Sequence, residues 1–588
     1  MAVSAGHSRL YSRHSLETCI LENSASRNDK DLTTLNRPAS LPTRSAGPGW
    51  RFYAAFGCLC LVNLVCALDA TSLAVAIPIV AEKLHGTAIE ASWWGTSFLL
   101  TATVFQPTFA SLSHVFGRKA LLLIALTFFT AGAIVAALAY NSTVMIVGRS
   151  IQGVGGGGIS ALTYVIVTDM VTLQERGKWF GLISMMWALG SVLGPVIGGV
   201  IAEKTSWRYI FWLNLPFCAL AFTTIPVFLQ MKPVQGNMKE KLARVDWLGS
   251  FLFVASITAI LIPLTWGGVM YPWNHWRTLV PLVVGCVGMA LFALWSCTMP
   301  VEPILRGSLF KSPTALVSYF GTIVHGMFLW SVLYYMPLYF EGAKGMSPIS
   351  AGIALFPWTF TTGPAAVVVG LIVAKTGKYT WAIWLGWVLT AAGASVMTLF
   401  KADTKTAEWI PLSLISGLGM GILYPAMSFA IQASASNRDL PSAAALYSFF
   451  RNFGQMLGVA VGGAIFQNQV KRNMLQYPDL ADKAVDYSKD ASALVEVIKI
   501  MPESRNALKG ELITSYVESL RMLWLVMFVL ALVALVIAAI YTKSISLERE
   551  LETEQGFSGG KIKPVDFEMA VRNPESAGTK RIVSIHGT

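Results

Sequence analysis

Long apolar segments separated by short polar connections dominate the chain. A helix needs about 20 predominantly apolar residues to cross the hydrocarbon core of a bilayer, and the sequence contains fourteen such segments. They cover approximately residues 52–80, 92–113, 119–139, 143–168, 179–202, 208–230, 247–267, 278–298, 313–340, 348–374, 380–400, 409–433, 441–467 and 519–542. The pattern therefore predicts an all-α membrane protein with fourteen transmembrane helices.

The composition excludes most soluble classes of protein. The chain has 588 residues, of which 54% are hydrophobic and only 13% charged, whereas an ordinary soluble domain is about 25% charged. Soluble multidomain enzymes, disordered scaffolds and disulfide-rich secreted modules are therefore ruled out. The net charge of +12 does not indicate nucleic acid, because the basic residues form short clusters between apolar segments, as in cytoplasmic loops that face an anionic leaflet.

The loop charges predict that both termini are cytoplasmic. If the N-terminus is inside, the short cytoplasmic loops hold thirteen Lys and Arg residues and the short outer loops hold seven, which is the bias that the positive-inside rule requires. Residues 1–50 contain no apolar core, so we expect no cleavable signal peptide. Six of the seven cysteines lie in apolar segments and none lies in an expected outer loop, so we expect no disulfide framework.

The sequence also repeats itself. GSVLGPVIGG at 190–199 aligns with GQMLGVAVGG at 454–463, and IQGVGGG at 151–157 aligns with ISGLGMG at 415–421, both with an offset of 264 residues. A weaker match has a similar offset. Secondary transporters are commonly built from two such repeats, which rock around a site near the bilayer midplane.

The repeat and the apolar segments together predict the organisation of the chain. We expect two homologous six-helix bundles with two helices inserted between them. The expected parts are a disordered cytoplasmic tail (1–50), the first bundle (51–230), the inserted helices (246–298), the second bundle (312–542, with a long outer loop at 468–518) and a cytoplasmic C-terminal tail (543–588).

Two charged side chains inside apolar segments are the first candidates for a function. A carboxylate such as Asp69 is costly inside a membrane and is a functional hypothesis by default, although a buried Asp that merely pairs for packing is the alternative. Asp69 and Arg149 lie at expected depths of roughly 15 and 9 Å from the outer boundary at 1.5 Å per residue, close enough for long side chains to meet. A cation favours an ionised carboxylate and an apolar site favours a neutral one. Competition between the cation and the apolar surroundings predicts that Asp69 binds and releases a proton. A static ion pair is the alternative.

Five strings resemble the fourteen-helix drug:proton antiporters of the major facilitator superfamily, particularly the fungal toxin-efflux members. They are LDATSLAVAIP (68–78), an R-x-x-Q-G string (Arg149, Gln152, Gly153), GSVLGPVIGG (190–199), FASLSHVFGRK (109–119) and SWRYIFWLNLP (206–216). The resemblance covers roughly residues 50–545. It implies a major facilitator fold and transport that is driven by the proton gradient without a bound cofactor.

Two of these strings carry specific expectations. One matches the antiporter motif G-x-x-x-G-P-x-x-G-G without departure, through Gly190, Gly194, Pro195, Gly198 and Gly199. The resemblance associates this motif with antiport and therefore with export. Glycines four residues apart also let two helices approach closely, so a packing face alone is the alternative.

The loop string matches the gating motif of the superfamily at Gly117, Arg118 and Lys119, but His114 stands where that motif has Asp. In the family that Asp helps to latch one conformation. A neutral His would weaken the latch and a protonated His would reverse its charge, so we expect an altered or pH-sensitive gate. A tolerated substitution is the alternative.

The substrate cavity is expected to be apolar and aromatic. Its candidates, chosen by their positions along the helices, are Trp93, Trp94, Phe98, Trp187, His325, Phe328, Tyr334, Tyr335 and Arg451. Packing roles are the alternative for most of them. For Arg451 the alternatives are attraction of an anionic substrate and pairing with a helix carbonyl. Asn141 begins a glycosylation sequon in a very short outer loop.

The sequence therefore predicts a proton-coupled antiporter, and not an enzyme, that exports small, largely apolar toxins, metabolites or drugs across the plasma membrane. It contains no phosphate-binding G-x-x-x-x-G-K-[ST] loop and no zinc-ligand spacing. We expect a monomer whose partners are protons, a small substrate and the lipid bilayer, with no nucleic acid. A vacuolar transporter of basic amino acids and a non-transporting membrane sensor are the alternatives.

Overall fold

A computed structural model describes residues 49–557 except 269, 299–301, 490, 492–493, 503–505, 550–552 and 554. The two tails expected at 1–50 and 543–588 thus lie largely outside the described residues. Every named element in the described part is a helix, which confirms the all-α prediction. The described residues between 50 and 557 belong to one compact unit.

The N-terminal half of this unit is a bundle of helices that we call the N-terminal bundle. It consists of α2 (Trp50–Leu84), α3 (Ala88–Val104), α4 (Gln106–Phe116), α5 (Arg118–Ala137), α6 (Ser142–Met170), η1 (Leu173–Glu175), α7 (Arg176–Lys204), α8 (Arg208–Trp212) and α9 (Asn214–Phe228). One expected span, 92–113, is divided between α3 and α4, because Pro107 at the start of α4 cannot donate to the helix before it.

Two further helices follow before the C-terminal half. The connection contains α10 (Met238–Arg244), α11 (Trp247–Trp266), α12 (Trp276–Thr298) and η2 (Gly307–Phe310). Helices α11 and α12 pack mainly against each other, and α11 also contacts α3 and α18.

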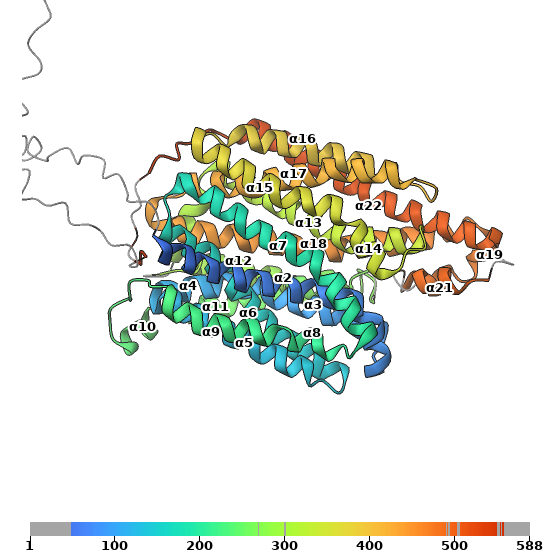
Figure 1. The fold of residues 1–588 in the computed structure, drawn as a ribbon, viewed down its shortest axis with the longest axis horizontal. Coiled ribbons are helices and arrows are strands. Elements are labelled where there is room, and N and C mark those ends of the chain that lie inside the picture. The colour runs from blue at the N-terminus through green and yellow to red at the C-terminus, as the bar shows by residue number, and fades with distance from the viewer. Residues whose placement is uncertain are drawn as a thin grey trace, which may run out of the picture. The chain divides into compact units, whose positions relative to one another are not determined.

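The remaining helices form the C-terminal bundle. They are α13 (Pro313–Gly342), α14 (Pro348–Ala354), α15 (Phe356–Thr376), α16 (Thr380–Met397), α17 (Thr406–Ala433), η3 (Asn437–Asp439), α18 (Leu440–Met474), α19 (Pro478–Ala481), α20 (Ala484–Lys489), α21 (Leu494–Ile500) and α22 (Asn506–Tyr541). Figure 1 shows this bundle, in yellow to red, beside the N-terminal bundle in blue to green. The two bundles meet where α7 packs on α15 and α6 packs on α18.

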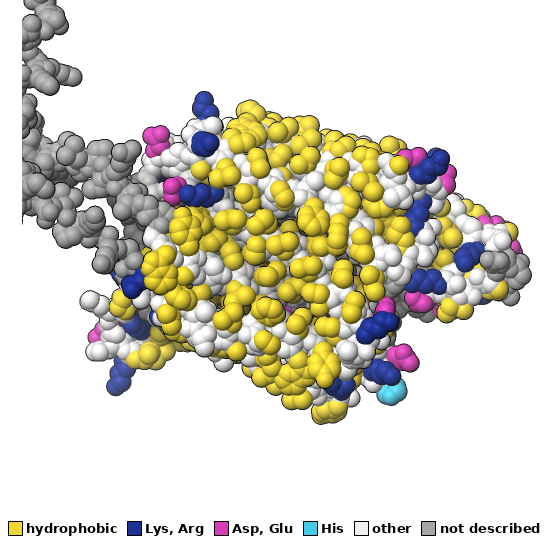
Figure 2. Space-filling view, viewed as in Figure 1, with side chains coloured by type: hydrophobic (Ala, Val, Ile, Leu, Met, Phe, Trp, Pro, Cys, Tyr) yellow, Lys and Arg dark blue, Asp and Glu magenta, His cyan; other side chains and the backbone are white. Residues whose placement is uncertain are grey.

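Twelve helices in the described part of the chain are long and apolar enough to cross a membrane. The two other expected spans lie on α3–α4, where each helix is too short to count, and on α18, which is too polar. The count of fourteen thus stays a prediction. Hydrophobic side chains cover the middle of the face in Figure 2, and charged side chains gather at its two ends, as expected for a protein in a bilayer.

The long outer connection expected at 468–518, whose pattern is partly helical, contains three short helices between two long ones. Helix α18 continues to Met474 and α22 begins at Asn506. Helices α19–α21 lie between them and bury Leu480, Leu494 and Ile498 against the C-terminal bundle. This connection is therefore a packed part of the bundle, because its apolar residues find partners there.

Close approach of two helix pairs explains the repeated glycines. In the N-terminal bundle, a Cβ added at Gly198 would lie 2.2 Å from the carbonyl oxygen of Ser72 on α2. In the C-terminal bundle, a Cβ added at Gly458 would lie 2.4 Å from the carbonyl oxygen of Met327 on α13. Helices α7 and α18 thus use the same glycine pattern against the first helix of their own bundle, which is the small-residue packing found in membranes.

Candidate functional site

The carboxylate of Asp69 is the centre of a buried polar cluster in the N-terminal bundle. Asp69 lies on α2 and is 1% exposed. Its Oδ2 atom accepts a hydrogen bond from Arg149 Nη1 at 2.5 Å, and its Oδ1 atom accepts from Gln152 Nε2 at 2.8 Å and from Asn214 Nδ2 at 2.7 Å. Both carboxylate oxygens are therefore satisfied, by donors from α6 and α9. The contact between Asp69 and Arg149 that the depth argument predicts is present.

The guanidinium of Arg149 is held by further contacts. Its Nε donates to the backbone oxygen of Trp94 at 3.1 Å, and Nη1 also donates to Gln152 Oε1 at 2.7 Å. Its charged carbon lies 4.4 Å from the ring centroid of Phe98, a cation–π distance. The cluster can therefore keep a charged carboxylate inside an apolar bundle, and protonation of that carboxylate would remove the charge that attracts Arg149.

Asn214 is the member of this cluster that sequence reasoning did not single out. It lies in SWRYIFWLNLP, which served only as a family marker. Its partner Asp69 is 145 residues away in sequence, so no local pattern indicates the contact. A polar amide at the beginning of α9, within an otherwise apolar segment, is the one signal that could have drawn attention to it.

The antiporter motif lies directly against the helix that carries Asp69. Glycines 190, 194 and 198 of α7 face residues 67–72 of α2. The hydroxyl of Thr71 donates to the carbonyl oxygen of Gly190 at 3.1 Å. Pro195 and Gly199 face the other bundle, near Gly352 and Ile349. The motif thus touches both the Asp69 helix and the C-terminal bundle.

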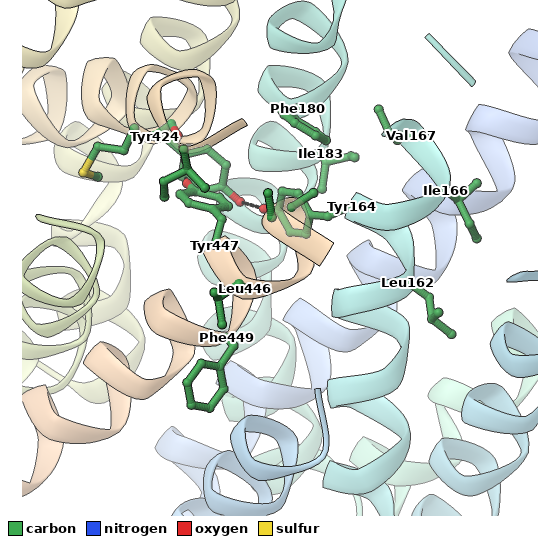
Figure 3. Packing of buried hydrophobic residues seen from close by; sticks show 14 of the residues in the cluster. Leu162, Tyr164, Ile166, Val167, Phe180, Ile183, Tyr424, Leu446, Tyr447 and Phe449 are labelled. Atoms are coloured by element: carbon green, nitrogen blue, oxygen red, sulfur yellow. Dashed lines mark hydrogen bonds between the residues drawn. The ribbon is translucent and has the colours of Figure 1, made fainter. Parts of the chain in front are cut away.

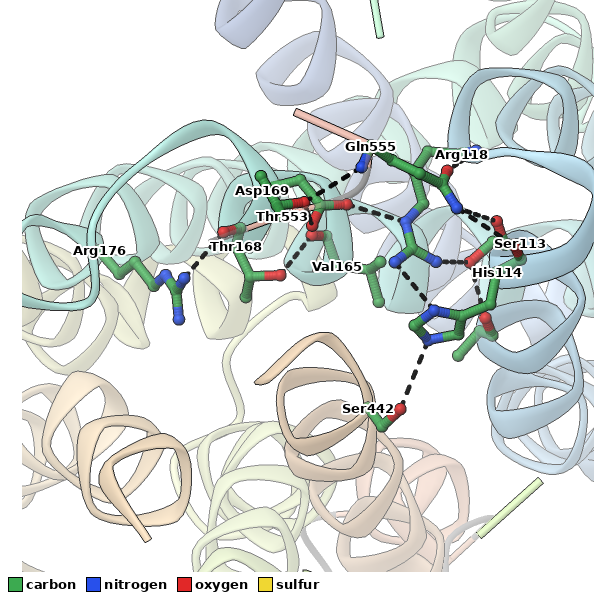
Figure 4. A network of polar contacts seen from close by, with 11 residues as sticks. Ser113, His114, Arg118, Val165, Thr168, Asp169, Arg176, Ser442, Thr553 and Gln555 are labelled. Atoms are coloured by element: carbon green, nitrogen blue, oxygen red, sulfur yellow. Dashed lines mark hydrogen bonds and ion pairs between the residues drawn. The ribbon is translucent and has the colours of Figure 1, made fainter. Parts of the chain in front are cut away.

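The predicted gating loop is part of a second polar network, drawn in Figure 4. Arg118 Nε forms an ion pair with Asp169 Oδ2 at 2.9 Å, and Arg118 Nη1 donates to Ser113 Oγ at 2.6 Å. His114, which replaces the motif Asp, lies between Arg118, at 3.2 Å from Nδ1, and Ser442 of α18, at 3.4 Å from Nε2. The imidazole therefore contacts both bundles, although it lacks the charge of a carboxylate.

Other parts of the chain complete this network. Gly117 has φ of 98°, in the left-handed region that favours glycine, and Lys119 Nζ donates to the carbonyl oxygen of Pro226 at 2.7 Å. Thr553 donates to Asp169 Oδ1 at 2.7 Å. Gln555 accepts from the backbone N–H of Arg118 at 3.2 Å. Neither C-terminal residue was predicted, because their contacts are distant in sequence.

Most of the cavity candidates pack within the bundles. Trp93 lies edge-on to Trp266 of α11, Trp94 donates to Ser142 Oγ, and Tyr335 donates to the carbonyl oxygen of Val459. Phe98 covers Arg149, as described above. Phe328 is 1% exposed in the C-terminal bundle and Trp187 of α7 is half-buried.

Two candidates lie where the bundles meet. The hydroxyl of Tyr334 on α13 approaches Gly95 on α3, where an added Cβ would lie 3.2 Å from it. Arg451 Nη1 donates to the hydroxyl of Tyr424 at 2.5 Å, and that hydroxyl is bonded to the hydroxyl of Tyr164 on α6. Figure 3 shows Tyr164 and Tyr424 pointing toward one another across the boundary.

The remaining candidate, His325, lies within the C-terminal bundle. Its Nε2 atom contacts the carbonyl oxygen of Met420 at 3.0 Å.

Asn141 has a structural contact of its own. Its side-chain oxygen accepts from the backbone N–H of Val144 at 2.8 Å and caps α6, which is a common role for Asn at this position. Glycosylation at this residue stays a prediction.

Comparison with known proteins agrees with this architecture. Residues 59–459 match the Major Facilitator Superfamily. The chain is 53% identical to "MFS transporter L2" of Phoma sp. over 89% of this chain and 87% of that protein. It is 34% identical to "MFS-type efflux pump LUC4" of Fusarium sp. over 90% and 94%, and 38% identical to "MFS-type efflux pump MMF1" of Pseudozyma antarctica over 72% and 79%.

A solved structure shares the fold. The crystal structure of the human organic anion transporter MFSD10 (TETRAN) superimposes with a TM-score of 0.51 over 82% of this chain and 99% of that one. The sequence identity is 12%, so the likeness concerns the fold alone.

Proposed function

This chain belongs to the major facilitator superfamily, and from that premise we propose that it is a proton-coupled antiporter which exports small, largely apolar compounds. It is a multi-pass membrane transporter and not an enzyme. Similar proteins from fungi have names that describe efflux pumps, which supports export as the direction. We place it in the plasma membrane with both termini cytoplasmic and propose that it acts as a monomer without a cofactor.

The observation that carries the proposal is the buried carboxylate of Asp69. A charged group inside a membrane bundle is costly and is usually retained for function. Here three side-chain donors stabilise the ionised form, whereas the surrounding apolar helices favour the neutral form. Such a group can change its charge when a neighbouring donor moves.

The mechanism follows from that competition. Substrate enters from the cytoplasm or the inner leaflet while Asp69 is ionised and paired with Arg149. The two bundles then rock so that the site opens outward, and a proton from outside neutralises Asp69. Loss of the ion pair lowers the affinity for substrate, and the return step delivers the proton inside. The tight packing of α7 on α2 supports this role, because it keeps Asp69 at a fixed place within a bundle that moves as one body.

The test is accumulation of lipophilic dyes and toxins in pump-deficient yeast that express the full chain, with and without a protonophore. We expect the wild type to lower accumulation and the protonophore to restore it. Asp69→Asn keeps the size of the side chain and removes its charge, so we expect it to abolish this efflux. Asp439→Asn is the control, because Asp439 is also a buried carboxylate but lies in η3, outside the Asp69 cluster, and pairs with Arg306.

The possible outcomes separate the proposal from its alternatives. Normal protonophore-sensitive efflux by Asp69→Asn would refute the mechanism. Wild-type protein found only on the vacuole would favour transport of basic amino acids. No change in accumulation for any compound, with the protein at the cell surface, would favour a sensor.

A further inference from the structure

Arg451 on α18 is a buried cation with a single hydrogen-bond acceptor among the described residues. Its side chain is 7% exposed. One nitrogen, Nη1, donates to the hydroxyl of Tyr424 at 2.5 Å, and the guanidinium carbon lies 4.0 Å from the centroid of the same ring. The Nε atom is buried and has no hydrogen-bond partner in the part of the chain that the structure describes. A buried charge that lacks an anion and leaves a donor unsatisfied is destabilising.

The other buried arginines are better matched. Arg149 pairs with Asp69 and Arg118 pairs with Asp169. Arg176 forms no ion pair among the described residues, but its Nε, Nη1 and Nη2 atoms donate to three different acceptors. For Arg451, no carboxylate in the described part of the chain lies within ion-pair distance, and a neutral phenol is its partner. The described residues therefore leave the charge of Arg451 without a partner anion.

The place of Arg451 in the fold suits a transported anion. It lies about 11 residues from the start of α18 at Leu440, or about 16 Å at 1.5 Å per residue, which is close to half the thickness of the hydrocarbon core. Its partner Tyr424 bonds to Tyr164 of the other bundle. When the two bundles separate around Tyr164 and Tyr424, the hydrogen bond between these tyrosines must break. Arg451 then faces the space between the bundles.

The surroundings define what could bind there. Tyr447 donates to the carbonyl oxygen of Tyr424 at 2.8 Å, and Phe449 and Leu446 lie on the same stretch of α18 (Figure 3). The Nδ1 atom of His325 is also buried without a hydrogen-bond partner from the described residues, and this imidazole packs edge-on against Tyr424. The aromatic and aliphatic side chains suit the apolar part of a ligand. The guanidinium suits a single negative group on that ligand, because it can bind a carboxylate through two parallel hydrogen bonds.

We propose that Arg451 is a substrate-binding residue for an acidic group, so that the exported compounds are lipophilic anions such as aromatic carboxylates. In the closed arrangement the hydroxyl of Tyr424 takes the place of the substrate oxygen. This inference rests on the proposed function, since it names the substrate class of the same transporter.

Binding to the purified full-length protein tests the inference without any transport. The probes are 1-naphthaleneacetate and 1-naphthaleneacetamide, which have nearly the same size and differ in charge at pH 7. Their apparent affinities are measured from the rise in melting temperature with probe concentration. We expect the wild type to prefer the acid by about tenfold or more, the ratio expected for one charge-assisted pair.

Two variants give opposite expectations. Arg451→Gln removes the charge and should bring the acid-to-amide ratio close to one. Tyr424→Phe removes the hydroxyl that competes for the guanidinium and should raise the ratio. Tyr339→Phe is the control, because it also removes a buried hydroxyl of the C-terminal bundle that donates to a backbone oxygen, and it should leave the ratio unchanged.

A merely structural role would give a different result. If the bond between Arg451 and Tyr424 only supported folding, both variants would lower the melting temperature and neither would change the preference for the acid. That outcome overturns the inference, as does a wild type that shows no preference for the acid. If Arg451→Gln does not fold, the acid-to-amide ratio of Tyr424→Phe alone tests the inference, and a ratio equal to that of the wild type overturns it. Failure of proton-coupled efflux in cells, with the preference for the acid intact, would instead refute the proposed function alone.

Discussion

Replacing Gly198 by alanine should separate α7 from the helix that carries Asp69. The added Cβ would lie 2.2 Å from the carbonyl oxygen of Ser72 and 2.8 Å from its carbonyl carbon. A favourable contact needs about 3.5 Å, so the helices must move apart by about 1 Å. Because the obstacle is backbone, no side-chain rotation can relieve it. Overpacking of this kind costs about 1–3 kcal/mol.

The neighbouring glycine of the same motif is a matched control. A Cβ at Gly199 would meet Ile349 Cγ1 at 3.3 Å and Val75 Cγ1 at 3.5 Å, so a shift of a few tenths of an ångström by side-chain atoms would suffice. We therefore expect the melting temperature of Gly199→Ala to be close to that of the wild type.

The assay is thermal unfolding of the full chain in detergent, followed by fluorescence-detected size-exclusion chromatography. We expect Gly198→Ala to lower the apparent melting temperature by a few degrees, the shift that about 1–3 kcal/mol produces. Proton-coupled efflux should fall as well, because Ser72 lies within one turn of Asp69. Equal melting temperatures for Gly198→Ala and Gly199→Ala would show that α2 and α7 do not approach as closely as described.

Two further substitutions test individual contacts. Asn214→Ala removes one of three donors to Asp69 and should reduce protonophore-sensitive efflux in yeast about tenfold or more, since a hydrogen bond to a charged group contributes about 1.5–3 kcal/mol; efflux equal to the wild type would argue against a role for this residue. Burial raises the pKa of Asp439, but hydrogen bonds from Arg306 and two serines outweigh it and hold that pKa below the ordinary 3.8. The ionised form therefore stabilises the fold above about pH 4, so Asp439→Asn should lower the melting temperature at pH 7 and differ less from the wild type as pH falls below about 4. A difference that stays constant below pH 4 would contradict this direction of the pKa shift.

The sequence was sufficient for those features that depend on position along a helix. Apolar length predicts the helices, the glycine repeat predicts two similar bundles, and residue depth predicts that Asp69 and Arg149 meet. Each of these properties depends on how residues are spaced along a helix, and that spacing can be seen in the sequence.

Features that depend on the direction in which a side chain points could not be predicted in the same way. A membrane helix is apolar on all sides, so its sequence does not tell which face meets its own bundle and which meets the cavity. Trp94 and Tyr335 were chosen by depth, but their polar atoms bond within their own bundles. Asn214 and Gln555 contribute through contacts with residues far away in sequence, for which a single chain offers no local signal.

The most direct test of the central claim is proton movement that depends on substrate. Inside-out plasma-membrane vesicles containing the protein are acidified internally, and the internal pH is followed with a fluorescent dye after addition of a compound that the yeast assay shows to be exported. We predict that the compound makes the lumen more alkaline in wild-type vesicles and leaves it unchanged with Asp69→Asn. Uptake of the compound without any change in internal pH would contradict proton-coupled export.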